Sequence, residues 1–178
     1  QRQMCIRDRV WPLFLFAVSG TILFPMANDL MMMFVALEIL SLPLYLLVGM
    51  SRRRRLLSQE AALKYFVLGA FSSAMFLFGA ALMYAASGEL TLGSIAEAVN
   101  GDPTTTWLLM TGVVFALIGL FFKVGAAPFH QWSPDVYQGA PTAVTAYMSA
   151  ATKIAAFGAL LRLLFVGLEG VQWNWQPV

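Results

Sequence analysis

Five long apolar stretches follow one another along the chain, with short polar segments between them. They cover residues 10–27, 30–50, 61–86, 107–127 and 140–166. A hydrocarbon core about 30 Å thick is crossed by roughly 20 helical residues, and each stretch is about that long. The pattern predicts an all-α fold, namely a polytopic membrane helix bundle with about five transmembrane helices.

The segment that follows the fourth stretch interrupts this helical pattern. Residues 119–142 read GLFFKVGAAPFHQWSPDVYQGAPT and contain three prolines, Pro128, Pro134 and Pro141. Each proline removes a backbone donor and disfavours helical geometry in the residue before it. We therefore predict one discontinuous helix with a break near 126–139, in which residues 128–139 form a short re-entrant or interfacial piece.

The two ends of the chain differ from its apolar body. We expect residues 1–9, QRQMCIRDR, to be a non-native or disordered lead, and residues 10–166 to form the transmembrane domain. Residues 167–178 contain WNWQPV and are expected to be a truncated interfacial tail. The chain stops without a clear terminus, so we expect a fragment of a larger protein.

Composition supports a membrane protein and excludes several other classes. Hydrophobic residues make up 60% of the chain and charged residues 11%, whereas soluble domains have about 45–50% and about 25%. A net charge of +2 is too small to indicate nucleic-acid binding. The single cysteine, Cys5, excludes an internal disulfide or a cysteine metal cluster. Small residues in the third stretch favour close helix packing; they are Gly69, Ser72, Ser73 and Gly79.

Charges in the loops predict the orientation. Arg52–Arg55 form a run of four arginines in a short loop, which the positive-inside rule places in the cytoplasm. The loop 87–106 carries acidic residues and no basic residue, as expected on the periplasmic side, and its glycines, including Gly88 and Gly93, are typical of turns. We predict a multi-pass protein of the bacterial inner membrane.

Four charged residues lie on four successive apolar stretches: Glu38, Lys64, Lys123 and Lys153. Inserting one such charge at a helix centre costs roughly 2.5–3.5 kcal/mol, so each is expected to face protein or water. At about 1.5 Å per residue from the arginine loop, Glu38 lies roughly 18 Å deep and Lys64 about 8–12 Å deep, within reach of each other. We therefore expect a Glu38–Lys64 pair, with Lys123 and Lys153 on either side of the break.

Lysine chemistry suits a proton relay. Burial disfavours the ammonium and a nearby carboxylate favours it, so a movable partner can switch the proton affinity of a buried lysine. His130 has a pKa range that suits it to bridge Lys123 and Lys153 through water, although a structural histidine is the alternative. Asp135 is expected to cap the short helix after the break. Static charge pairs in a purely structural subunit remain the other explanation.

Four segments of the chain are distinctive: ALEILSLPLYLLVG (36–49), EAALKYFVLGAFSSAMFLFGAALMYAASG (60–88), FKVGAAPFHQWSPDVYQGAPT (122–142) and SAATKIAAFGALLRLLF (149–165). They resemble the subunit N family of NADH-quinone oxidoreductase, respiratory complex I. The wording PFHQWSPDVYQGAP is typical of this family, whereas the related M and L subunits usually carry PxHxWLPDA. Subunits of sodium/proton antiporters share the fold and are the closest competitor.

The resemblance implies a function for each membrane charge. Glu38, Lys64, Lys123 and Lys153 match the relay positions of successive helices, so Lys64 and Glu38 would set the charge of Lys123. Lys123 would exchange a proton with Lys153 through His130 or waters. The second half-channel of the family would lie outside this chain.

The expected function is that of a proton-translocating membrane subunit of NADH:quinone oxidoreductase, which couples electron transfer from NADH to quinone with proton pumping. No cofactor or metal is expected in this chain; FMN, iron–sulfur clusters, NADH and quinone would belong to the parent complex. The expected partners are the other membrane subunits, the lipid bilayer and protons. The alternatives are a Mrp-type cation/proton antiporter subunit and a membrane subunit of a related hydrogenase.

Overall fold

The computed structural model describes residues 2–51, 55–98 and 103–169, and they form helices joined by short turns. Their order is α1 (Arg2–Met26), α2 (Leu30–Val48), α3 (Arg55–Ser87), α4 (Leu92–Ala98), α5 (Pro103–Val124), α6 (Trp132–Gly139) and α7 (Thr142–Arg162), which continues as a π-helix (Leu163–Gly167). In the described ranges the extended pairing is limited to an isolated bridge between Asp29 and Thr91. The prediction of an all-α bundle is confirmed.

Five helices are long and apolar enough to cross a membrane: α1, α2, α3, α5 and α7 with its π-helical end. This confirms the five expected spans, with two changes at their ends. Helix α3 begins at Arg55 rather than at residue 61, and α1 begins at Arg2. Residues 2–9 belong to this helix, and the expectation of a non-native or disordered lead stays a prediction. Residues 52–54 and 170–178, which include parts of the arginine loop and the tail, lie outside the described residues.

The turn between α1 and α2 is fixed by side-chain and backbone hydrogen bonds. The carboxylate of Asp29 accepts a bond of 2.7 Å from the N–H of Met32 and so caps α2. The carbonyl of Asn28 accepts from the N–H of Leu92, and the N–H of Leu30 donates to the carbonyl of Leu90, both at 3.0 Å. The turn is therefore tied to the connection between α3 and α4.

The connection between α3 and α4 differs in part from the expectation of simple turns. Gly88 has a φ of +74°, so it does make a turn. Gly93 instead lies inside α4, whose buried side chains Leu92 and Ile95 pack toward the π-helical end of α7. The apolar contact explains why this short segment is helical despite its glycine.

Helices α3 and α5 pack closely along a line of small residues. A Cβ atom at Gly112 would lie 2.8 Å from the backbone oxygen of Gly79, and one at Gly119 would lie 2.9 Å from the backbone oxygen of Ser72. The hydroxyl of Ser72 donates a hydrogen bond of 3.0 Å to the carbonyl of Gly119. The small residues expected to allow close packing on the third span are buried, and α5 supplies a matching set.

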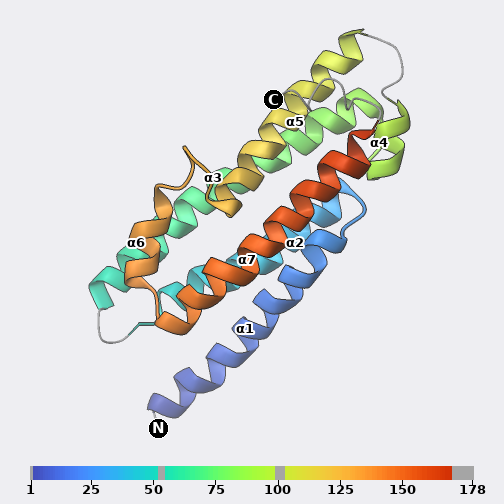
Figure 1. Cartoon of the computed structure of the whole chain (residues 1–178). Coiled ribbons are helices and arrows are strands. Elements are labelled where there is room, and N and C mark those ends of the chain that lie inside the picture. Colours follow the sequence, from blue (N-terminus) through green and yellow to red (C-terminus); the bar gives the residue numbers. More distant parts are fainter. Residues whose placement is uncertain (1, 52–54, 99–102, 170–178) are drawn as a thin grey trace.

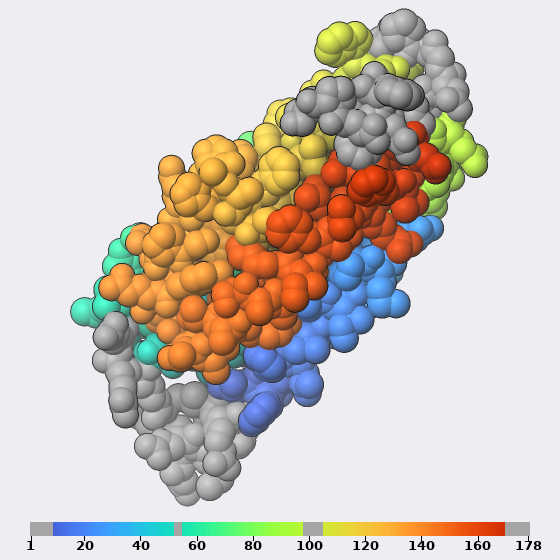
Figure 2. Space-filling view, viewed as in Figure 1, coloured from blue at the N-terminus to red at the C-terminus, as the bar shows by residue number. Residues whose placement is uncertain are grey.

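The predicted break is confirmed between α5 and α6. Helix α5 ends at Val124, part-way along the bundle, and a turn carries the chain sideways before α6 resumes (Figure 1). Gly125 in this turn has a φ of +77°, and the Ala127–Pro128 peptide bond is cis. Helix α6 packs on α3, where Gly139 lies against Ala61 and the backbone of Leu57. Helix α7 then crosses the front of the molecule between the α5–α6 side and the α1–α2 side (Figure 2).

Replacing Gly112 with valine is expected to force α3 and α5 apart, because the new Cβ would meet backbone and side-chain atoms of α3. Overpacking of this kind costs about 1–3 kcal/mol. The measurement is the free energy of unfolding of the protein in detergent. Gly93→Val is the matched control, since no atom lies within 4 Å of a Cβ there. Equal stability of the two variants would show that α3 and α5 do not touch at Gly112.

Candidate functional site

The side chain of Lys123 is buried between three helices. It comes from the last turn of α5 and is only 4% exposed. Its Nζ donates a hydrogen bond of 2.6 Å to the Oγ of Ser41 on α2. The same Nζ lies 5.5 Å from the ring centroid of Tyr45 and 5.7 Å from that of Tyr65. One hydroxyl and two aromatic faces thus stabilise an ammonium in an otherwise apolar core.

Glu38 and Ser41 lie on the same side of α2 because they are three residues apart. The hydroxyl of Ser41 donates to the carbonyl of Leu37 in the preceding turn and accepts from Lys123, so both of its roles are fixed. Glu38 is partly buried on this side of α2. A carboxylate near a buried ammonium favours the charged form of the lysine, which burial opposes.

Lys153 binds the backbone of Lys123. Its Nζ, on α7, donates a hydrogen bond of 3.1 Å to the carbonyl oxygen of Lys123 and lies 4.9 Å from the ring centroid of Trp132. The two lysines therefore belong to one site, with Lys153 on the side of the break. Their like charges repel each other, so the protonation of either lysine disfavours the protonation of the other.

The break leaves carbonyls at the end of α5 that need donors from outside the helix. The carbonyl of Phe121 accepts from the N–H groups of Gly125 and Ala126. The carbonyl of Phe122 accepts from the indole Nε1 of Trp132 at 3.1 Å, and the carbonyl of Lys123 accepts from Lys153. The negative end of the helix dipole thus faces a cation, which is the favourable arrangement.

Trp132 holds the aromatic side chains of the site together. Its ring stacks on Tyr65 with centroids 5.0 Å apart and on Phe122 with centroids 5.3 Å apart. Because its indole also bonds to the carbonyl of Phe122, the first residue of α6 is fixed against the end of α5. The Nζ of Lys153 lies over the ring of Trp132, and the Nζ of Lys123 lies over the ring of Tyr65, so the stacked rings contact both lysines.

The expected pair between Glu38 and Lys64 is wrong. The Nζ of Lys64 lies 2.7 Å from a carboxylate oxygen of Glu60 and 2.7 Å from one of Asp135, and its side chain is 44% exposed. The reason is the face of α3 on which Lys64 lies. Tyr65 faces α2, where it meets Tyr45, and the neighbouring residue in a helix points about 100° away. Lys64 consequently faces α6.

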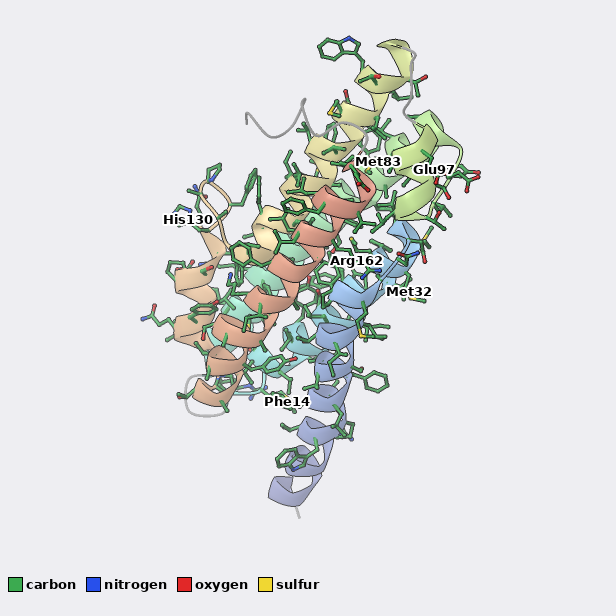
Figure 3. All side chains as sticks on the ribbon, turned by 45° about the vertical axis from the view of Figure 1, so that its right-hand side comes forward. Phe14, Met32, Met83, Glu97, His130 and Arg162 are labelled. Carbon is green, nitrogen blue, oxygen red and sulfur yellow. The ribbon has the colours of Figure 1, made fainter. Side chains whose placement is uncertain are left out.

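His130 does not lie between the two lysines. It is exposed in the turn before α6, and its ring points away from the bundle at the outer edge of the break (Figure 3). The link between Lys123 and Lys153 runs through a backbone carbonyl instead. The expected bridging position of His130 is therefore wrong, because the turn after Gly125 carries this residue outward.

Two further residues of α6 lie beside the site. Asp135 lies in the first turn of α6, as expected for an acid that stabilises the start of this helix, and its carboxylate also binds Lys64. Tyr137 has a hydroxyl that is buried without a hydrogen-bond partner in the described part of the chain, and burial raises its pKa. Within those residues, no group of three or more His, Cys, Asp or Glu could hold a metal ion.

Sequence reasoning missed Ser41 and Trp132. The i, i+3 spacing of Glu38 and Ser41 was a usable signal, because it places a hydroxyl beside the buried carboxylate. Trp132 gave no such signal, since its role depends on how α6 returns to the end of α5.

The comparison with family models decides the classification. Residues 27–178 match the family described as NADH:quinone oxidoreductase/Mrp antiporter, TM. The chain belongs to this family. The match contains every residue of the site, from Glu38 to Lys153, so the charges described above lie in the family's transmembrane region.

Similar proteins are subunits of respiratory and antiporter complexes. The chain is 63% identical to NADH-quinone oxidoreductase subunit N of Nocardioides sp. over 95% of its own length and 32% of the relative. The structure of respiratory complex I from Thermus thermophilus with bound aureothin has 47% identity over 86% of this chain and 33% of that chain, with a TM-score of 0.75. The Mrp complex from Dietzia sp. has 26% identity over 92% and 30%, with a TM-score of 0.79. The chain spans about a third of the length of these relatives.

The Ser41→Ala variant is expected to be less stable than the unaltered protein, because the ammonium of Lys123 loses its hydrogen-bond acceptor in a buried site. Such a loss costs about 1–3 kcal/mol. The measurement is the free energy of unfolding in detergent. Ser73→Ala is the matched control, because the hydroxyl of Ser73 is buried and has no partner in the described residues. If both variants lose the same stability, the bond to Lys123 contributes nothing.

Proposed function

We propose that this chain supplies one half-channel of a proton-translocating membrane subunit of NADH:quinone oxidoreductase. The observation that carries the proposal is the position of Lys123, whose side chain is 4% exposed in an apolar bundle and whose backbone carbonyl accepts a hydrogen bond from Lys153. A structural role alone would not require two linked lysines beside a broken helix, since a membrane interior penalises each charge. Family membership supports the same function.

In the proposed relay, Lys123 and Lys153 alternate between ammonium and amine. Glu38 favours the proton on Lys123, while the positive charge of Lys153 disfavours it. A proton that arrives on Lys153 therefore promotes loss of the proton from Lys123, and removal of the proton from Lys153 restores it. The bond from Lys153 to the carbonyl of Lys123 keeps the two sites close enough for this effect.

Lys64 contributes indirectly in this proposal. It joins α3 to α6 through Asp135, and α6 carries Trp132, which contacts Lys153 and the end of α5. A change in the Lys64–Asp135 pair would therefore reach the relay through the position of α6. The proposed relay does not need His130 between the lysines.

The remaining parts of the activity belong to the parent complex. Electrons would pass from NADH to quinone through FMN and iron–sulfur clusters in other subunits, and neighbouring membrane subunits would transmit the coupling signal. The second half-channel would lie in the part of the subunit that the relatives have beyond this chain. The arginine loop at 52–55 would face the cytoplasm of the bacterium.

A Mrp-type cation/proton antiporter subunit is the second candidate, because the Dietzia structure has the same fold over 92% of this chain. The 63% identity to a subunit N favours the first candidate over the 26% identity to the Mrp complex. Proton movement driven by NADH would support the first, and cation exchange without NADH would support the second.

The Lys123→Arg variant of the full-length subunit, in its assembled complex, is expected to lose NADH-driven proton pumping by at least about tenfold. Arginine keeps the positive charge but does not release a proton at physiological pH, so it separates charge from proton transfer. Acidification of inverted membrane vesicles measures pumping, and a native gel confirms assembly.

Val114→Ala is the control on the same helix, because Val114 is 56% exposed on the outer face of this chain and lies more than two helical turns before Lys123. Its pumping is expected to equal that of the unaltered complex. Normal pumping by Lys123→Arg would contradict the relay and leave Lys123 with a purely structural role.

A further inference from the structure

Gly125 occupies a position that favours glycine for two reasons. Its φ of +77° lies in the left-handed region, where a side chain is strained. A Cβ atom built on it would also lie 2.6 Å from the Nζ of Lys153 and 3.5 Å from the Oγ of Ser133. Gly88 has a similar φ of +74°, but no atom lies within 4 Å of a Cβ there. The two glycines therefore share a backbone conformation, but only Gly125 has a neighbouring side chain in the space that a Cβ would occupy.

The space beside Gly125 is filled by the ammonium of Lys153. From there Nζ donates to the carbonyl of Lys123, two residues before the glycine, and lies against the ring of Trp132. A methyl group at position 125 would displace this ammonium from the carbonyl. The lysine side chain is flexible at its far end, so it would move before the backbone does.

We propose that Gly125 is a positioning residue of the relay, which lets the ammonium of Lys153 bind the open end of α5 at the carbonyl of Lys123. This inference rests on the function proposed above and names how its two lysines are joined. One residue then presents both contacts: the side chain of Lys123 is one proton carrier, and its carbonyl binds the other carrier.

The contact makes the protonated form of Lys153 more favourable than its surroundings otherwise allow. A carbonyl at the negative end of a helix stabilises a cation, and a neutral amine gains much less from it. The elements near Lys153 carry charges at Lys123 on α5, Glu38 on α2 and Asp135 on α6, which is bound to Lys64 of α3. Helix α1 packs along α7 and carries Arg9 at its exposed end. In the described residues no carboxylate forms an ion pair with Lys153, so the carbonyl is its principal acceptor.

The contact also links the protonation of Lys153 to the conformation of the end of α5. When Lys153 loses its proton, the carbonyl of Lys123 loses a cationic donor, and the end of α5 is held less tightly. Because Lys123 is in this last turn, its side chain responds to the same change. Protonation of Lys153 thereby acts on Lys123 through the backbone as well as through charge repulsion.

The test compares Gly125→Ala with Gly88→Ala in the full-length subunit of the assembled complex. Both substitutions introduce a side chain at positive φ, but only the first meets Lys153. The readout is the pH profile of NADH-driven proton pumping in inverted vesicles. For Gly125→Ala, we expect the pH profile of pumping to shift to lower pH by about one unit. Without the carbonyl, Lys153 binds its proton less tightly and is protonated only at a higher proton concentration.

Gly88→Ala is expected to keep the unaltered profile. A uniform loss of pumping at every pH in Gly125→Ala, with the profile unshifted, would overturn the inference and leave Gly125 a purely structural glycine. So would equal profiles in the two variants.

The proposed function has a separate test within the same vesicles. If the unaltered complex does not pump when NADH is supplied, the proposed function fails. If it pumps and Lys123→Arg does not, the function holds, and the result for Gly125→Ala decides the further inference alone.

Discussion

The burial of a positive charge at Lys123 is the constraint on which the rest of this structure depends. A charge placed in an apolar interior is costly unless polar groups and opposite charge surround it. Here the hydroxyl of Ser41, the faces of Tyr45 and Tyr65 and the negative charge of Glu38 supply that environment. These groups come from α2 and α3, so both helices must pack against the end of α5.

The break in the helix gives the buried charge a second partner. If α5 continued as a regular helix, the carbonyl of Lys123 would bond to a backbone N–H in the next turn. Because the helix stops at Val124, this carbonyl is open to Lys153, and the indole of Trp132 binds the carbonyl beside it. Irregular backbone at membrane depth is tolerated only where protein or water satisfies it. The same groups that satisfy the break therefore create the contact between two titratable lysines.

Part of this arrangement could be predicted from the sequence. The lengths of the apolar stretches gave the five spans, the prolines gave the break, and the cost of membrane charges pointed to Lys123 and Lys153. The partner of Lys64 was predicted wrongly because depth along a helix says nothing about rotation around it, and Tyr65 takes the face toward α2. His130 was placed wrongly because the path of the turn after Gly125 decides on which side it lies. The spacing of Glu38 and Ser41 could have placed a hydroxyl beside the carboxylate, but the role of Trp132 depends on contacts between helices, which no local pattern specifies.

The most direct test of the central claim asks whether Lys123 and Lys153 act as one unit. The measurement is NADH-driven proton pumping by the assembled complex with Lys123→Gln, with Lys153→Gln, and with both. If the two lysines carry protons in one relay, either substitution alone stops the flux. The double variant then pumps as much as whichever single variant pumps less. Losses that multiply in the double variant would show that the lysines act independently, and would contradict the relay.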